Sequence, residues 1–310
     1  MEVGSAENNP QIEGEIRVDA IVVSYKSAET LRGCVEPLAA MPGVRVTVVD
    51  NASPDDSVAT VEDLDARIIR APRNGGFSYG CNLGAARGSA PFILFLNPDA
   101  RMGADALAGM LDVMRAEPDT ALVGPRIVED GDELAWSLRR FPRHRSTFAQ
   151  AVFAHRLLPR SAWTDELIRD PAAYDERWSP DWVSGACMLV RRDAFEQIGG
   201  FDERFFLYCE DTDLCRRLWD AGHVVRFEPA AEVSHMGGAS SEPGETRAVA
   251  ARSRVLYAQK HMGRARARFE ATGVALGEAT RAVAKLRRSK SRRSHVGAMR
   301  AALSPRDRSR

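Results

Sequence analysis

Short apolar runs that end in polar residues recur along the first third of the chain, and each is followed by a segment with helical spacing. Short runs of β-prone residues predict strands that are buried on both faces. The intervening segments repeat apolar residues every three or four positions, which predicts helices that cover the strands. The predicted strands are 18–25, 44–51, 67–70 and 92–96, and the predicted helices are 28–40, 57–64 and 78–87. This alternation predicts an α/β fold with a mostly parallel, doubly wound sheet.

The rest of the chain is less regular. Predicted helices span 104–116, 192–198 and 210–221, and predicted strands span 121–125, 182–190 and 223–227. Between them, residues 129–181 are rich in Arg and Trp and carry no clear period. A segment this long without elements is unusual in a compact domain, so we expect a functional lid or elements that local patterns do not reveal.

The most informative run is Phe92–Leu96, which leads directly into Asn97-Pro98-Asp99. Proline cannot continue a central strand, so the chain must turn at Pro98 and Asp99 follows the carboxyl end of the strand. Ligands of open α/β sheets bind at that end. A carboxylate at this position can hold a divalent cation and, through it, a diphosphate. The alternative is a turn Asp that accepts nearby backbone N–H groups.

Two further segments follow predicted strands or helices at positions suited to a ligand. Asp50 ends the second predicted strand, where a carboxylate can accept hydrogen bonds from a base or ribose, or can cap the next turn. The loop 74–77, Asn-Gly-Gly-Phe, offers unhindered backbone beside an aromatic ring, which suits close approach to a ligand. Its alternative is a simple glycine turn, since the spacing is not a dinucleotide fingerprint.

An acidic cluster, Glu210-Asp211-Thr212-Asp213, opens a predicted helix after the aromatic segment 205–208. Acidic residues in a first helical turn are favoured by the helix dipole, which explains part of the cluster. A carboxylate beside apolar rings can also have a raised pKa and act as a general base. His235 follows another predicted strand and is either a metal or phosphate ligand or a structural histidine.

Composition and charge narrow the class of protein. The chain has 310 residues, is 44% hydrophobic and has a formal net charge of zero, as expected for a globular protein. No apolar run approaches the roughly 20 residues that cross a bilayer, and residues 1–15 lack a secretion leader and suggest a disordered tail. Five scattered cysteines have no zinc-ligand spacing, which indicates buried or idle thiols in a reducing cytosol.

The charge is unevenly distributed. Within 281–310, Asp307 is the sole acidic residue among many Lys and Arg. Such a tail predicts contact with an anionic surface, either lipid headgroups or nucleic acid, or else a solvated tail without a partner.

These motifs together resemble the family 2 glycosyltransferases of the GT-A fold, and most closely their bacterial rhamnosyltransferase branch. The resemblance covers 18–260. It is carried, in order, by Val22–Tyr25, Val48–Ser53, Asn74–Phe77 with Asn82, Asn97–Asp99, Gly199–Glu203, Glu210–Leu214 and His235. It implies a Rossmann-like, mostly parallel sheet flanked by helices, with a helical basic tail at the C-terminus. The expected division is a disordered tail (1–16), a catalytic domain (17–262, with a donor half 17–125 and an acceptor half 126–262) and a basic tail (263–310).

The resemblance also implies residue roles. Asp211 would be the catalytic base, and Asp99 with His235 would hold Mg²⁺ or Mn²⁺. The family's Asp-X-Asp is Asn97-Pro98-Asp99 here, so a single carboxylate faces the metal, which fits Mg²⁺ held mainly by the substrate diphosphate. Donor-binding residues would be Ser24, Tyr25, Asp50, Asn74, Gly76, Phe77, Asn82, Asn97 and Asp99. Ser240 and Arg252 would contact the diphosphate, and we expect Trp182, Gly185 and Glu210 at the acceptor.

The resemblance therefore implies an inverting transfer of a sugar, L-rhamnose from dTDP-rhamnose, to a glycan or a polyprenyl-diphosphate-linked sugar. An enzyme with a basic tail and no membrane span fits a cytoplasmic protein held peripherally at the inner membrane face. Two alternatives are a metal-dependent nucleotidyltransferase and a non-catalytic nucleic-acid-binding protein. The first would need a glycine-rich loop where Ser24-Tyr25-Lys26-Ser27 stands, and the second would need aromatic residues interleaved in the tail. We therefore expect no nucleic-acid partner.

Overall fold

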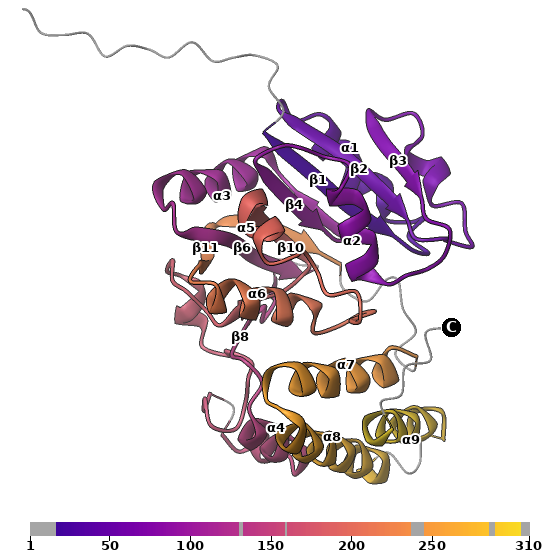
Figure 1. The fold of residues 1–310 in the computed structure, drawn as a ribbon, viewed down its shortest axis with the longest axis vertical. Coiled ribbons are helices and arrows are strands. Elements are labelled where there is room, and N and C mark those ends of the chain that lie inside the picture. The colour runs from indigo at the N-terminus through magenta and orange to yellow at the C-terminus, as the bar shows by residue number, and fades with distance from the viewer. Residues whose placement is uncertain (1–16, 130–132, 159, 237–244, 285–288, 305–310) are drawn as a thin grey trace, which may run out of the picture.

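A curled, mostly parallel sheet forms the body of the protein, and a group of helices lies beneath it (Figure 1). The computed structural model describes residues 17–129, 133–158, 160–236, 245–284 and 289–304. Within this part of the chain the main sheet has nine strands. Their spatial order is β3 (Ala66–Arg70), β2 (Val44–Asp50), β1 (Val18–Ser24), β4 (Phe92–Leu96), β10 (Cys187–Arg191), β6 (Thr120–Glu129), β11 (Val224–His235) and β5 (Ala100–Met102), with β7 (Glu133–Leu134) paired to β6.

Strand directions confirm the predicted α/β class. Strands β3, β2, β1 and β4 run parallel to one another, and β6 and β11 form a second parallel pair. Strand β10 is antiparallel to β4 on one side and to β6 on the other, so it joins the two parallel groups. The carboxyl ends of β1, β2 and β4 therefore lie at one edge, where the sequence places its candidate donor residues.

Helices cover both faces of this sheet because the strand side chains alternate. In β1, Val18, Ala20 and Val22 face one core and Ile21 and Val23 face the other. The first core is closed by α1 (Leu31–Ala39) and α3 (Ala104–Ala116). The second is closed by α2 (Phe77–Ala85), α5 (Arg192–Gln197) and α6 (Glu210–Asp220).

Two predicted elements have a different secondary structure from the one expected. The expected strand 182–190 is split into β9 (Trp182–Val183) and β10, and β9 pairs with β8 (Leu138–Arg139) in a separate two-stranded sheet. The break at Gly185 has a physical reason, because the Gly185 N–H leaves the sheet to donate to Asp211 Oδ2 at 3.0 Å. The expected helix 57–64 is a 3₁₀ turn, Val58–Val61, in which Thr60 Oγ1 donates to Ser57 O.

Residues 129–181 are more structured than the sequence predicts. They include β7, β8, α4 (His144–Ala151) and two 3₁₀ turns, Ala154–Arg156 and Pro171–Tyr174. The buried Tyr174 hydroxyl orders this region, since it accepts from Leu138 N at 2.9 Å and donates to Ile168 O at 3.2 Å. The predicted strands 121–125 and 223–227 also continue further, to Glu129 and His235.

The C-terminal region forms a helical bundle of α7 (Glu245–His261), α8 (Arg264–Ala284) and α9 (Ser289–Leu303), joined by α4 (Figure 1). This confirms that the basic tail is helical. Arg254 of α7 bridges Glu166 and, at 2.8 Å, Glu270 of α8. His295 of α9 lies 2.6 Å from Glu278 of α8. The bundle therefore ties the predicted tail to the predicted catalytic domain through buried ion pairs.

The remaining predictions about the chain as a whole have mixed outcomes. The disordered tail predicted for 1–16 lies outside the described residues. All five cysteines are free, and four are buried, which raises the pKa of their thiols. No described helix is both long enough and apolar enough to cross a bilayer.

Candidate active site

The donor side of the site begins where β1 and β2 end. Ser24 and Asp50 are register partners in the parallel pair, so their side chains leave the sheet at the same edge. Asp50 Oδ1 accepts from Ser53 N at 2.9 Å, which leaves Oδ2 available to a ligand. The Ser24 hydroxyl is buried and has no hydrogen-bond partner among the described residues. Tyr25 follows at the same edge and is half-buried.

The structure adds Asn51, to which the sequence patterns assign no role of its own. Its amide donates to Asn74 Oδ1 and to Gly76 O, both at 3.0 Å, and its Oδ1 accepts from Gly75 N at 3.0 Å. Asn51 thus holds the glycine loop against the end of β2. Its position directly after Asp50 marks it as a residue at the end of a strand, but no local pattern reveals its partners in the loop.

Gly76 is required by its backbone conformation and by its neighbours. Its φ is +88°, and a Cβ there would lie 2.2 Å from Phe206 O. The next residue, Phe77, donates its N–H to the same carbonyl at 2.8 Å. The loop that the sequence assigned to the donor is therefore packed directly on the aromatic segment that precedes the acidic cluster.

Asn82 of α2, another predicted donor residue, bonds to the 201–203 loop through its side-chain amide. Its Nδ2 donates to Phe201 O at 2.9 Å and to Glu203 Oε1 at 3.0 Å, and its Oδ1 accepts from Phe201 N at 2.9 Å. Both ends of the amide are thus engaged in holding the 201–203 loop, so Asn82 positions the site's framework.

The structure brings Asn97, Asp99 and His235 together. Strand β5 pairs with β11, and the register sets His235 opposite Ala100. His235 Nε2 lies 3.3 Å from Asn97 Nδ2 and 3.1 Å from Asp99 Oδ1. The latter contact falls outside hydrogen-bond geometry, so Asp99 Oδ1 is buried without a hydrogen-bond partner in the described part of the chain.

An unsatisfied buried carboxylate oxygen beside an imidazole nitrogen fits a divalent cation. Carboxylate oxygen suits Mg²⁺ and Mn²⁺, and neutral imidazole is a common ligand of divalent metals. No cluster of three His, Cys, Asp or Glu side chains that could hold a metal occurs among the described residues. Asp99 and His235 would therefore hold such a metal together with further ligands, from water or from a substrate.

Glu210 and Asp211 differ in environment although they are neighbours. Asp211 is half-buried, and its carboxylate accepts from Gly185 N at 3.0 Å and from Thr212 N at 2.7 Å. Burial raises the pKa of Asp211, and these hydrogen bonds oppose the rise. Glu210 is buried with Oε2 unpaired among the described residues, and burial followed by the Asp211 charge raises its pKa well above the ordinary value. The pKa of Glu210 is displaced further than that of Asp211, so Glu210 holds a proton more readily than its neighbour.

The turn before this pair is strained. Tyr208 and Cys209 have φ values of +68° and +64°, a left-handed conformation that costs roughly 1–2 kcal/mol for each non-glycine residue. Ser253 of α7 holds the turn by donating to Leu207 O at 2.7 Å, and Asp213 N donates to Cys209 O at 2.8 Å. Two consecutive left-handed residues without glycine give no signal in the sequence.

The Ser184–Ala186 segment connects the two acidic positions. Gly185 N donates to Asp211 Oδ2, and Asn97 N donates to Ala186 O at 2.9 Å. Asp211 is therefore two hydrogen bonds away from the turn that carries Asp99. Trp182, the other predicted acceptor residue, is held by its Nε1 donating to Arg140 O at 3.0 Å.

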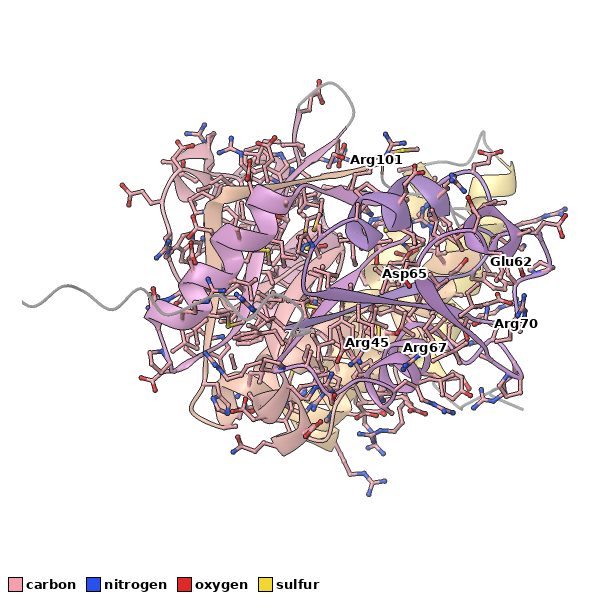
Figure 2. All side chains as sticks on the ribbon, turned by 90° about the horizontal axis from the view of Figure 1, so that it is seen from above. Arg45, Glu62, Asp65, Arg67, Arg70 and Arg101 are labelled. Carbon is pink, nitrogen blue, oxygen red and sulfur yellow. The ribbon has the colours of Figure 1, made fainter. Side chains whose placement is uncertain are left out.

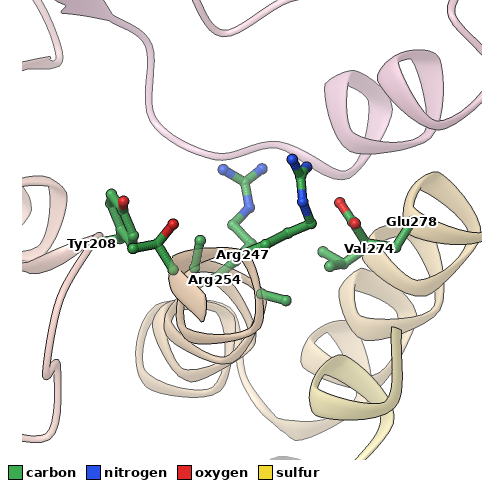
Figure 3. Close-up of a pocket in the computed structure, with 8 residues that line it drawn as sticks. Tyr208, Arg247, Arg254, Val274 and Glu278 are labelled. Carbon is green, nitrogen blue, oxygen red and sulfur yellow. The ribbon is translucent and has the colours of Figure 1, made fainter. Parts of the chain in front are cut away.

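Of the two predicted diphosphate residues, the structure describes one. Arg252 is exposed on α7, and Ser240 lies outside the described residues. A cavity of about 400 Å³ instead opens between Tyr208 and helices α7 and α8 (Figure 3). Arg247 and Arg254 lie side by side in its lining, and Arg247 donates to Ser294 Oγ at 3.1 Å.

Comparisons with known proteins decide the family. The Glycosyl transferase family 2 profile matches residues 19–199. The N-acetylglucosaminyl-diphospho-decaprenol L-rhamnosyltransferase of Mycobacterium tuberculosis is 31% identical over 269 residues, which cover 81% of this chain and 87% of that protein. The chain is a family 2 glycosyltransferase. This glycosyltransferase also matches, over residues 172–237, the profile described as N-terminal domain of galactosyltransferase. It is similar to rhamnosyltransferase WbbL of Escherichia coli, with 30% identity over 46% of this chain and 52% of that protein.

Solved structures show that the glycosyltransferase has the GT-A fold that the sequence predicts. The mannosyltransferase PcManGT from Pyrobaculum calidifontis, solved with GDP-Man and Mn²⁺, aligns with a TM-score of 0.60 and 16% identity over 94% of this chain and 88% of that one. S. aureus TarS with UDP-GlcNAc aligns with a TM-score of 0.54 and 14% identity over 93% and 82%. Membership of this family excludes the two alternatives, a nucleotidyltransferase and a nucleic-acid-binding protein.

Proposed function

We propose that this glycosyltransferase moves L-rhamnose from dTDP-rhamnose to a polyprenyl-diphosphate-linked sugar, with inversion, during cell-wall or polysaccharide synthesis. The names of two relatives, a decaprenol-linked L-rhamnosyltransferase and the rhamnosyltransferase WbbL, support the sugar, and the first also supports the lipid-linked acceptor. The observation that carries the proposal is the hydrogen-bonded path from Asp211 through Gly185 and Ala186 to Asn97. It supports a single site in which a base and a metal-binding turn face the same substrates.

On the donor side, Asp50 accepts hydrogen bonds from the nucleobase, with Ser24 and Tyr25 beside it. The loop 74–77 approaches the donor with its backbone, and Asn51 keeps that loop in place. Asp99 Oδ1 and His235 Nε2 would hold Mg²⁺ or Mn²⁺, which when bound neutralises the diphosphate and stabilises the departing nucleotide. Ser240 and Arg252 would contact the same diphosphate.

On the acceptor side, Asp211 removes the proton from the attacking hydroxyl. Asp211 Oδ1 already accepts from Thr212 N and, at 3.2 Å, from Thr212 Oγ1, whereas among the described residues Oδ2 accepts only from Gly185 N. Oδ2 therefore has room to receive the proton. Glu210 holds a proton more readily than Asp211, which limits negative charge beside the base, and Trp182 and Gly185 border the acceptor.

The enzyme would act at the inner face of the plasma membrane, held there peripherally by contact with anionic lipid. The cavity beside Tyr208 supports an acceptor that approaches from the side of the helical bundle. A panel of sugar nucleotides with Mg²⁺ and a polyprenyl-diphosphate-linked GlcNAc acceptor tests the proposal by nucleoside diphosphate release. The expected result is turnover with dTDP-rhamnose, and turnover with another sugar nucleotide instead would reject the proposed donor.

A further inference from the structure

One end of the helical bundle carries a large exposed apolar surface. Phe269, Leu276 and Val283 recur every seven residues on α8 and are 53%, 40% and 62% exposed. Side chains at this spacing lie in one stripe along a helix. The segment that follows α4 adds Val152, Leu157, Leu158 and Trp163, which are 57–84% exposed.

These two groups of side chains belong to one surface because α4 packs along α8. Phe148 of α4 stacks on Phe269 with ring centroids 4.5 Å apart. Further along, Thr280 Oγ1 donates to Ala151 O at 2.7 Å. Figure 1 shows α4 and α8 adjacent at the end of the molecule away from the donor half of the sheet. We call this surface, defined by residues 145–158, residues 160–163 and the exposed side of α8, the α4–α8 face.

The charge on the α4–α8 face has one sign. Residues 145–163 contain no Asp or Glu, and the two glutamates of α8, Glu270 and Glu278, are buried in ion pairs. Its exposed charged side chains are all arginines, and within the described part of the chain none of them forms an ion pair: Arg145, Arg156, Arg160, Arg264, Arg266 and Arg268.

The opposite end of the molecule is different. Figure 2 views that end and shows Glu62 and Asp65 among Arg67 and Arg70. There Arg70 pairs with Glu62 at 2.8 Å. Mixed charges are typical of a solvated surface, whereas apolar side chains among unpaired arginines are typical of a surface that enters the headgroup region of an anionic bilayer.

We propose that the α4–α8 face docks on an anionic lipid bilayer, with its apolar side chains inserted and its arginines at the phosphates. This goes beyond a basic tail as the anchor, because the surface is built by the middle segment and α8 together. Helix α7 connects the face to the site: Arg254 donates to Thr147 of α4 and to Glu270 of α8, while Ser253 holds Leu207 beside the catalytic turn. A docked face would therefore hold the acceptor side at a fixed height above the membrane.

Point substitutions suit the test better than truncation, because α9 packs on α7 and α8 and its loss would uncover the bundle. The charge variant is Arg266→Glu/Arg268→Glu, and its matched control is Arg67→Glu/Arg87→Glu, two exposed arginines in the donor half. The apolar variant is Leu157→Ser/Leu276→Ser, and its control is Leu303→Ser, an exposed leucine of α9 outside the face.

The full chain and each variant are sedimented with phosphatidylglycerol-containing vesicles at low and high salt. We expect the charge variant to bind at least about tenfold more weakly at low salt, because each basic residue near an anionic surface contributes severalfold. We expect the apolar variant to lose at least about fivefold at both salt concentrations, since salt does not screen insertion. Both controls should bind like the unaltered protein, and all variants should keep its circular dichroism and melting curve.

Equal binding by the unaltered protein and the two face variants would overturn the proposal, as would an equal loss in the controls. Sedimentation of the protein without vesicles tests the alternative that a second copy of the chain binds this face. A dimer that forms with the unaltered protein and not with the apolar variant would identify the α4–α8 face as a contact between copies and overturn the proposal. The link to a lipid-linked acceptor rests on the proposed function, but vesicle binding does not. Turnover on a water-soluble acceptor, measured in parallel, separates failure of the chemistry from failure of the docking surface.

Discussion

Replacement of Gly76 by alanine tests the packing of the donor loop on the turn that precedes the acidic pair. The new Cβ would lie 2.2 Å from Phe206 O and 2.7 Å from Phe206 Cα. A relaxed carbon–oxygen contact is about 3.3 Å or longer, so the two segments must separate by about 1 Å. Both atoms belong to backbone, and no side-chain rotation can relieve the contact.

The energetic cost follows from two effects. A φ of +88° with a ψ of 177° is a conformation that costs a non-glycine residue about 1–3 kcal/mol. Separation also weakens the 2.8 Å hydrogen bond from Phe77 N to Phe206 O, worth about 1 kcal/mol. We therefore expect Gly76→Ala to lower the free energy of unfolding by about 2–4 kcal/mol and to weaken donor binding at least about tenfold.

Urea denaturation and calorimetry with the sugar nucleotide measure the two effects. The matched control is Gly109→Ala in helix α3. The new Cβ there would meet only Ala231 Cβ, at 4.0 Å. That change should leave donor binding unaltered and raise stability by up to about 1 kcal/mol, as alanine favours a helix. An unaltered denaturation midpoint and donor affinity in Gly76→Ala would refute the reasoning.

Three further predictions concern single side chains. Asp99→Ala should weaken Mg²⁺-dependent donor binding more than binding of the bare nucleoside, and equal losses in calorimetry would identify a structural turn Asp. Asn51→Ala should lower the free energy of unfolding by about 2 kcal/mol, since three hydrogen bonds to the glycine loop disappear, and should also raise KM for the donor; an unchanged KM would contradict the positioning role. Glu210→Gln should become increasingly more stable than the unaltered protein as pH rises above the ordinary pKa of a glutamate, about 4.3. The raised pKa of Glu210 means that the folded state favours the neutral carboxyl group. Its contribution to the free energy of unfolding is therefore fully present below the pKa of the unfolded chain and is lost as pH rises through the pKa of the folded protein. Glutamine has no charge, so the variant does not lose stability in this way. A difference in melting temperature that does not change with pH would count against the assignment.

The parts of the fold that local patterns specify were predictable. Strands β1, β2 and β4 are short apolar runs with a polar end, and Pro98 fixes where β4 stops. Strands β8 and β9 have two residues each, which is too short for any period to appear. They arise from the pairing of distant segments and from the Gly185 contact with Asp211, neither of which is a local signal.

The candidate site likewise contains residues that local patterns identify and residues that they do not. Asp50, Asp99 and Asp211 stand at strand or helix ends, so the sequence could identify them. Asn51 could not be assigned a role, because its partners lie 23 to 25 residues further along the chain. The basic C-terminal region has the composition of a solvated tail. A packed bundle is revealed by the pairing of buried Glu270 and Glu278 with cations of other helices and by the apolar cluster that α7, α8 and α9 share.

Asp211→Asn provides the most direct test of the central claim, that this glycosyltransferase uses Asp211 as the base in rhamnosyl transfer. Purified protein and variant are incubated with dTDP-rhamnose, Mg²⁺ and a polyprenyl-diphosphate-linked GlcNAc acceptor, and the rhamnosylated product is followed over time. Asparagine keeps the hydrogen-bonding shape but cannot accept the proton, so turnover should fall at least about a hundredfold while donor affinity and melting temperature stay unchanged. Turnover by a well-folded Asp211→Asn protein at the rate of the unaltered enzyme would contradict the account.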